Sequence, residues 1–123
     1  MLGYQQSRWG YSISQERVEE LAEKFEEYEL PIDVIHLDID YMHGYRDFTW
    51  DTKKYQHPKE FVEQMRKRGI RLMPILDAGV KEDPDYDLYQ EGLEQGYFVK
   101  NPDVRFMSMQ SGQANRSFLT LVA

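Results

Sequence analysis

The spacing of apolar residues predicts an amphipathic helix near the start of the chain. Between residues 12 and 29 the apolar side chains recur at helical intervals, with glutamates on the opposite face. Ser12 and Ser14 are both suitable N-caps, and Ser12 has Gln15 three residues later, as in a capping box. Proline at position 31 ends the helix, because it disfavours helical geometry in the residue before it. A helix is therefore expected over this range, starting at either serine.

Two candidate strands flank this helix. Residues 2–6 form a short one and residues 34–39 a longer one, along which side chains alternate between two faces. One face of the longer strand is wholly apolar. The other turns polar toward the carboxyl end, where Asp38 and Asp40 stand. His36 lies on this second face, and we interpret it as a hydrogen-bonded interior histidine rather than a catalytic one.

A second helix is expected to begin at Pro58, because proline suits the first turn of a helix. Its side facing the core is expected to carry Phe61, Val62 and Met65. Gly69 is expected to end it, since glycine is favoured just beyond a helix C-terminus.

A third strand is expected over residues 70–79, ending in Asp77. Pro74 cannot donate a hydrogen bond within a sheet, so a local bulge is expected there. A shorter helix is predicted around residues 86–94, followed by a strand or extended piece at 97–102.

The order strand, helix, strand, helix, strand indicates an α/β fold with a parallel sheet. In such sheets, binding sites lie beyond the carboxyl ends of the strands. Asp38 and Asp77 would both stand there, at the ends of two neighbouring strands.

Composition excludes several classes of function. The chain has 22 acidic and 15 basic residues and a formal net charge of −7, which disfavours a nucleic-acid partner and an anionic membrane surface. No apolar run approaches the roughly 20 residues of a membrane span. Cysteine is absent, so there is no disulfide and no thiol nucleophile. With no apolar signal-peptide core visible at the start, a cytoplasmic location is favoured, provided that the true N-terminus is present.

Three interpretations of the Asp38 and Asp40 pair remain open at this point. The carboxylates can cap a loop, bind a hard cation with His43 nearby, or accept hydrogen bonds from a polyhydroxylated ligand. Trp9 can stack on a sugar ring or fill the core. No G-x-S-x-G, Walker A or dinucleotide-binding pattern is present.

Four blocks of the sequence, spread over about residues 2–103, carry a family resemblance. They are LGYQQSRWGY, LPIDVIHLDIDYMHGYRDFTWD, RGIRLMPILDAGVKEDP and EGLEQGYFVKNPD. In this order and spacing they resemble the catalytic barrel of glycoside hydrolase family 31, which comprises α-glucosidases and related α-glycosidases. The resemblance implies a partial (β/α)8 barrel of about the first three βα units. It also implies retaining hydrolysis of terminal α-linked glucosides, with an α-glucoside or oligosaccharide substrate and no metal or organic cofactor.

The resemblance also implies roles for five residues. Asp38 matches the aspartate that binds hydroxyl groups of the non-reducing sugar in the glycone subsite. Ile39 and Ile75 match apolar residues that line this subsite. Asp77 matches a residue at its floor, and Trp9 matches an aromatic position at its wall. Strand alternation fits Ile39 less well than the others, unless the alternation breaks as the strand ends.

The sequence also departs from the family pattern. His36 stands where tryptophan is common, and Ala78 stands where proline is usual. The family's nucleophile, in a W-x-D-x-N-E type motif, and its acid/base aspartate have no counterpart here. We therefore expect residues 1–105 to be the N-terminal part of a glycoside hydrolase barrel. Residues 106–123 are expected to be a tail unlike the family, polar and loop-like over SMQSGQANRS and apolar at FLTLV.

A full barrel typically needs about 250 residues. The chain is accordingly expected to be a fragment of an α-glucosidase that is inactive alone and associates with itself through exposed barrel edges. The alternative function is a non-catalytic sugar-binding α/β domain.

Overall fold

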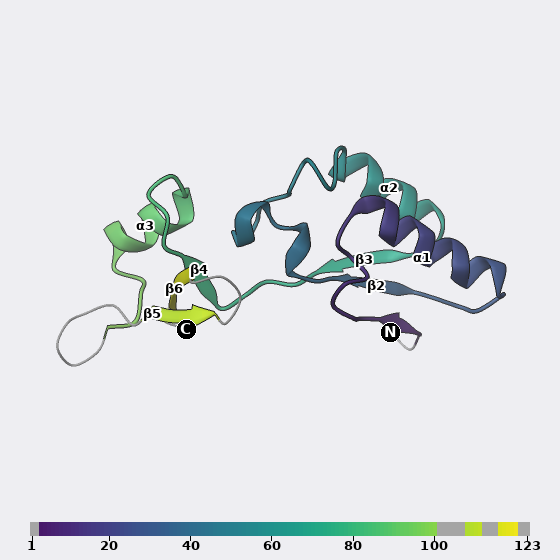
Figure 1. The fold of residues 1–123 in the computed structure, drawn as a ribbon, viewed down its shortest axis with the longest axis horizontal. Coiled ribbons are helices and arrows are strands. Elements are labelled where there is room, and N and C mark those ends of the chain that lie inside the picture. The colour runs from purple at the N-terminus through teal and green to yellow at the C-terminus, as the bar shows by residue number, and fades with distance from the viewer. Residues whose placement is uncertain (1–2, 101–107, 112–115, 121–123) are drawn as a thin grey trace. The chain divides into compact units, whose positions relative to one another are not determined.

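The first sheet of the protein is parallel, as the alternating strands and helices predict. The computed structural model describes residues 3–100, 108–111 and 116–120, with side chains described as far as residue 100. The chain folds into two compact units, residues 1–76 and residues 77–123 (Figure 1). Each unit has a sheet of its own.

In the first unit three parallel strands lie in the order β1-β2-β3 (Figure 1). They are β1 (Gln5–Gln6), β2 (Val34–Leu37) and β3 (Arg71–Pro74). Helix α1 (Gln15–Glu27) connects the first two strands, and α2 (Pro58–Lys67) lies between the second and the third. This arrangement confirms the predicted order of elements.

Ser14, rather than Ser12, caps the start of helix α1. The Ser14 hydroxyl accepts a hydrogen bond from the backbone N–H of Arg17 at 3.3 Å, which makes Ser14 the N-cap. The predicted capping box at Ser12 is wrong, because Ser12 is buried and its hydroxyl bonds to the distant Asp38 instead.

Strand β2 is shorter than predicted. It ends at Leu37, and a short 3-10 helix, η1 (Ile39–Tyr41), follows at once. A second 3-10 turn, η2 (His43–Tyr45), comes next. The strand alternation assumed for residues 34–39 therefore breaks before Ile39.

Helix α2 has the predicted ends but not the whole predicted core face. Pro58 occupies its first turn, and Gly69 follows it with a φ of +82°, a conformation that favours glycine. Phe61 and Met65 are buried as expected. The expectation for Val62 is wrong, because its side chain is 39% exposed. The buried positions repeat every four residues, which places Val62 to the side of the apolar stripe.

Strand β3 accommodates Pro74 without a bulge. Its pairing with β2 runs without a break from Val34↔Arg71 to Leu37↔Pro74, so the predicted bulge is wrong. The backbone N–H groups of Arg71 and Ile75 donate to β2 or the residue before it. Because alternate residues of a strand direct their N–H groups to opposite sides, the nitrogen of Pro74 faces away from β2. The proline therefore removes no hydrogen bond between these two strands.

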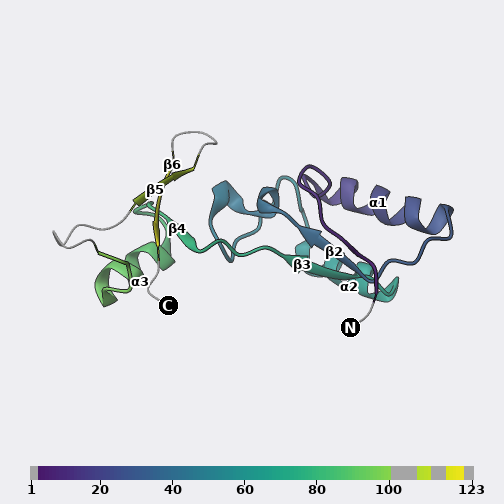
Figure 2. The same cartoon turned by 90° about the horizontal axis from the view of Figure 1, so that it is seen from below.

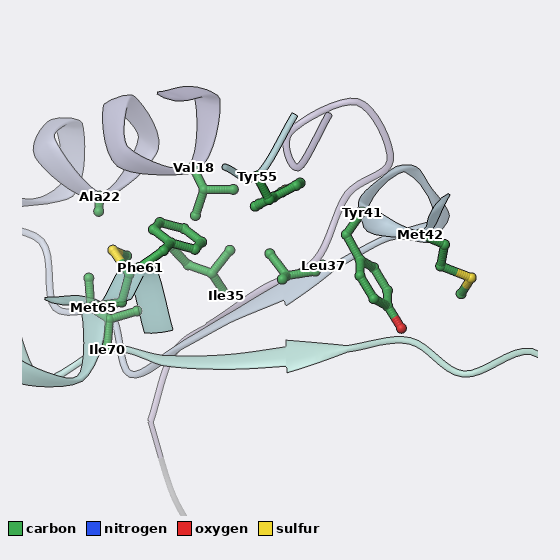
Figure 3. Packing of buried hydrophobic residues seen from close by; sticks show 10 residues of the cluster. All are labelled: Val18, Ala22, Ile35, Leu37, Tyr41, Met42, Tyr55, Phe61, Met65 and Ile70. Atoms are coloured by element: carbon green, nitrogen blue, oxygen red, sulfur yellow. The ribbon is translucent and has the colours of Figure 1, made fainter. Parts of the chain in front are cut away.

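The core of the first unit lies between the sheet and the two helices, which cover the same face of the sheet (Figures 1 and 3). Aromatic rings and aliphatic side chains from helices, strands and the loop after β2 meet there (Figure 3). The buried members are Val18, Ala22, Ile35, Leu37, Tyr41, Met42, Tyr55, Phe61, Met65 and Ile70.

The second unit contains an antiparallel sheet in the order β4-β6-β5. Its strands are β4 (Gly79–Lys81), β5 (Ser108–Ser111) and β6 (Arg116–Thr120), and β5 and β6 pair side by side (Figure 2). The expected strand at 70–79 is thus divided, with β3 ending at Pro74 and β4 beginning at Gly79.

Helix α3 (Asp87–Gln95) agrees with the predicted third helix to within a residue. Phe98, from the expected extended segment at 97–102, packs in a small core with Val80 and Tyr86. Residues 101 and 102 of that segment lie outside the described residues.

The expected loop at 106–123 is partly wrong, because 108–111 and 116–120 are strands. Backbone pairing between neighbouring strands does not require an apolar pattern, so the mostly polar sequence of β5 and the start of β6 did not indicate strands. The remaining residues of this range lie outside the described part of the chain.

Candidate functional site

The carboxyl ends of β2 and β3 lie side by side. Leu37 pairs with Pro74, and the backbone N–H of Ile75 donates to the carbonyl of Leu37 at 2.9 Å. The next residue after Leu37 is Asp38. The structure therefore brings Asp38 and Ile75, from segments far apart in the sequence, to the same end of one sheet.

Asp38 is held by backbone and side-chain hydrogen bonds where the chain leaves β2. Its backbone N–H donates to the hydroxyl of Ser12 at 2.8 Å. Its carboxylate oxygen Oδ1 accepts from the N–H of Ile39 at 2.8 Å and so caps η1. Among the described residues no other group bonds to this half-buried carboxylate, which leaves Oδ2 able to accept from a ligand. The capping interpretation is therefore correct for one oxygen and leaves the ligand interpretation open for the other.

Asp40 has a different environment. Its side chain is only 14% exposed, and the Lys54 ammonium lies 3.9 Å from its Oδ1 while also donating to its backbone carbonyl at 3.2 Å. Asp40 thus anchors the loop after β2 to the segment before α2. Asp38 therefore keeps one carboxylate oxygen available to a ligand, whereas Asp40 has a structural role.

Ile75 is fixed from two sides. Besides its bond to β2, its carbonyl accepts from the Tyr41 hydroxyl at 2.8 Å, and Figure 3 shows the Tyr41 ring extending from η1 toward the chain beyond β3. Its side chain is 42% exposed. Ile39 is partly buried and packs against the core. These contacts place one exposed and one half-buried apolar side chain close to Asp38.

Trp9 stands in a tight turn after β1. The N–H of Tyr11 donates to the carbonyl of Arg8 at 3.3 Å, and Gly10 supplies the positive φ of +88° that the turn needs. The Trp9 side chain is 59% exposed, so the interpretation that it fills the core is wrong. An aromatic ring of this kind is available to a ligand.

Asp77 is exposed and is the first residue of the second unit. The structure therefore gathers Asp38, Ile39 and Ile75 at one end of the first sheet. Trp9 stands in the segment between β1 and α1, and Asp77 belongs to the other unit.

The loop that follows Asp38 is braced by its own side chains. The Thr49 hydroxyl accepts from the N–H of His43 at 3.0 Å and donates to the carbonyl of Arg46 at 2.6 Å. Tyr45 and Phe48 have φ values of 61° and 60°, which are costly for aromatic residues and persist only when surrounding contacts enforce them. The carboxyl end of β2 is thus followed by a defined loop.

His36 and His43 do not form a metal centre with the aspartates. Nε2 of His36 lies 3.0 Å from Oε1 of Gln5, so this histidine is hydrogen-bonded as expected, but it is half-buried rather than interior. Among the described residues, no three His, Cys, Asp or Glu side chains gather closely enough to hold a metal ion. No helix in the same part of the chain is both long and apolar enough to cross a membrane.

Sequence reasoning missed three residues that build this site: Ser12, Tyr41 and Tyr55. Each bonds to a residue at least 26 positions away, and no local pattern announces such a partner. Ser12 was noticed only as a possible helix cap, and its bond to Asp38 becomes visible only in the structure.

Comparison with known proteins identifies the family of this chain. Residues 1–120 match the model of the glycosyl hydrolases family 31 TIM-barrel domain. The chain belongs to glycoside hydrolase family 31. The match includes much of the segment 106–123, although the domain boundary at residue 105 itself stays a prediction.

Two curated α-glucosidases are similar to most of the chain. Alpha-glucosidase 2 of Bacillus thermoamyloliquefaciens is 50% identical over 99 residues, which are 80% of this chain and 12% of that protein. Neutral alpha-glucosidase C of Mus musculus is 42% identical over 102 residues, or 83% of this chain and 11% of that protein. The chain therefore spans about a tenth of the length of these relatives.

A solved glucosidase II structure has the same fold. The crystal structure of a glucosidase II alpha subunit with bound Glc1Man2 superimposes on this chain with a TM-score of 0.88 at 30% sequence identity. The match covers 98% of this chain and 13% of the glucosidase II chain. The three parallel strands with their helices are therefore part of a (β/α)8 barrel.

Proposed function

We propose that the chain is a segment of a retaining α-glucosidase and forms part of the pocket for the terminal glucose. The observation that carries this proposal is the half-bonded carboxylate of Asp38 at the carboxyl end of a barrel strand. In barrels of this kind the active site is built at that end of the strands. The relatives that are α-glucosidases support the substrate class.

Asp38 would recognise the sugar through charge-assisted hydrogen bonds. Oδ1 is already bonded to the backbone of Ile39, so Oδ2 is the oxygen that accepts from sugar hydroxyl groups. Because Oδ1 caps η1, the carboxylate has few alternative orientations. Little reorganisation is then needed when the sugar binds.

Three further side chains of the first unit would line the same pocket. Ile39 and Ile75 present apolar surface to the carbon skeleton of the sugar, and Trp9 offers an exposed ring for stacking. For Asp77, in the second unit, a role in sugar binding rests on the family resemblance alone.

The chemical step needs two more carboxyl groups. In a retaining glycosidase one carboxylate attacks the anomeric carbon, and a second group protonates the leaving oxygen and then activates water. The nucleophile motif of the family is absent from these 123 residues. The segment therefore supplies substrate binding, and the reacting carboxylates would come from elsewhere in the full-length protein.

The test is hydrolysis of an aryl α-glucoside and of maltose by the full-length protein that carries this segment. The aryl α-glucoside should give its aglycone and glucose, and maltose should give glucose. NMR during the first turnovers should show that the glucose is released in the α configuration. Binding of glucose without any hydrolysis would instead support the non-catalytic sugar-binding domain.

A further inference from the structure

Ser12 is a buried polar residue that none of the proposed sugar contacts uses. It is 1% exposed, and its hydroxyl accepts the backbone N–H of Asp38, 26 residues later, at 2.8 Å. Its carbonyl oxygen accepts the hydroxyl of Tyr55 at 2.7 Å. One residue thus joins the segment before α1, the end of β2 and the segment before α2.

Tyr55 is a dependable donor in this arrangement. Its side chain is fully buried, and its ring lies 5.4 Å from that of Trp50 and 5.7 Å from that of Phe61. Burial raises the pKa of Tyr55, with smaller contributions from the negative charges of Asp40 and Glu16. The hydroxyl therefore keeps its proton at all ordinary pH values and continues to donate to Ser12.

These contacts fix Asp38 at three points. Ser12 holds its N–H, Tyr41 donates its own N–H to the Asp38 carbonyl at 3.3 Å, and Ile39 holds Oδ1 of the carboxylate. Of these three hydrogen bonds, only the one to Ser12 joins Asp38 to a residue outside the loop after β2. It sets where Asp38 stands relative to the segment that also carries Trp9.

We propose that Ser12, supported by Tyr55, is a positioning residue for Asp38. By holding the backbone of Asp38, Ser12 directs the free oxygen Oδ2 to where the sugar hydroxyl groups bind. The inference rests on the proposed role of Asp38, while the contact itself can be tested separately.

A double-mutant cycle in the full-length protein tests the coupling. Ser12→Ala should lower kcat/KM for an aryl α-glucoside by about 10- to 100-fold, mainly through kcat, because a displaced binding group costs most in the transition state. In an Asp38→Asn background the same change should cost less than about 3-fold, because residues that act through one another are not additive. A full loss in both backgrounds would overturn the proposal.

Ser14→Ala is the matched control. It removes a serine hydroxyl two residues away, which caps α1 and does not touch Asp38. It should leave kcat/KM within about 2-fold in both backgrounds, since it is independent of the site. A loss as large as that of Ser12→Ala would show that any disturbance of this segment suffices, and would overturn the specific role of Ser12.

Tyr55→Phe decides the matter if Ser12→Ala does not fold. The variant keeps the buried ring and removes only the hydroxyl that holds Ser12. It should lower kcat/KM by about 3- to 10-fold, less than the loss of the Ser12 hydroxyl itself. Unchanged kcat/KM in a folded Tyr55→Phe protein would contradict the proposal.

Amide hydrogen exchange separates this inference from the proposed function. Ser12→Ala should speed exchange of the Asp38 amide by about 10-fold or more relative to the wild type and to Ser14→Ala. If the full-length protein hydrolyses no α-glucoside, the proposed function fails, and this exchange rate alone decides on the contact. An unchanged rate would then overturn the positioning role.

Discussion

The two tryptophans of the chain differ in burial and therefore in expected role. Trp9 is 59% exposed in a turn, whereas Trp50 is partly buried and lies edge-on to Tyr41 and Tyr55 at centroid distances of 5.1 and 5.4 Å. Burial of large aromatic rings stabilises a fold, while an exposed ring at the end of a barrel strand is available to a ligand. The two positions therefore predict opposite consequences of the same substitution.

Trp9→Ala in the full-length protein should lower kcat/KM by about 2- to 12-fold, the equivalent of roughly 0.5–1.5 kcal/mol of ring stacking, with little change in thermal stability. Trp50→Ala is the matched control, and it should lower the melting temperature clearly because it opens the aromatic cluster. The measurements are steady-state kinetics and calorimetry. A fall in melting temperature for Trp9→Ala without loss of kcat/KM would mean that Trp9 is structural.

At the scale of elements, α3 depends on a glycine for close packing. A Cβ atom built on Gly92 would lie 2.4 Å from Cζ of Phe98, whose ring is 2% exposed. Gly92→Ala should therefore destabilise the second unit by about 1–3 kcal/mol, the usual cost of overpacking. The gain of roughly 0.5–1 kcal/mol from replacing a helical glycine is too small to offset it.

Native-state hydrogen exchange of residues 86–98 in the full-length protein measures this effect. Glu91→Ala, at the exposed neighbouring position, is the control and should change local stability by less than about 0.5 kcal/mol. Equal exchange in the two variants would mean that Phe98 moves aside at little cost.

Local patterns were enough to predict the helices and the parallel strands. Helical spacing and proline and glycine signals located α1, α2 and α3, because these signals act within a few residues. The place of Asp38 at the carboxyl end of a strand was predicted, but the end of β2 at Leu37 and the bond from Asp38 to Ser12 were not, because Ser12 lies 26 residues earlier in the chain. The strands at 108–111 and 116–120 were missed because their backbone pairing leaves little trace in side-chain pattern.

At the scale of the whole molecule, β3 is an edge strand of the first sheet in the described part of the chain, and its neighbourhood is apolar. Strand β3 is the last strand of its sheet, and the exposed apolar residues of β3 and the chain after it are Met73, Ile75 and Leu76, at 51%, 42% and 54% exposure. Unpaired edges with apolar side chains promote association. The isolated 123-residue chain should therefore form oligomers or aggregates in light scattering at micromolar concentration.

Met73→Lys should reduce this association, since a lysine on an edge strand opposes pairing with another edge. Glu60→Lys, which adds two positive charges rather than one at an exposed position of α2, is the control and should not reduce the association. A monomer with a sharp melting transition independent of concentration would contradict the expectation.

The isolated chain should also release no glucose from an aryl α-glucoside. Retaining hydrolysis needs two positioned carboxyl groups, and the family's nucleophile motif is absent from this sequence. Turnover by a highly purified sample, free of host glucosidase, would show that residues within these 123 suffice for the chemistry.

The role of Asp38 in the full-length protein is decided by one comparison, Asp38→Asn against Asp40→Asn. Asparagine can still cap η1, so Asp38→Asn should leave the melting temperature nearly unchanged. Loss of charge-assisted hydrogen bonding worth roughly 1.5–3 kcal/mol should lower kcat/KM by about 10- to 200-fold, partly in kcat. Asp40→Asn should change kcat/KM by less than about 3-fold, because Asp40 contacts Lys54 rather than the open end of the sheet. Full kcat/KM in Asp38→Asn, with a melting temperature lowered by several degrees, would mean that the carboxylate is only a cap and that the sugar binds elsewhere.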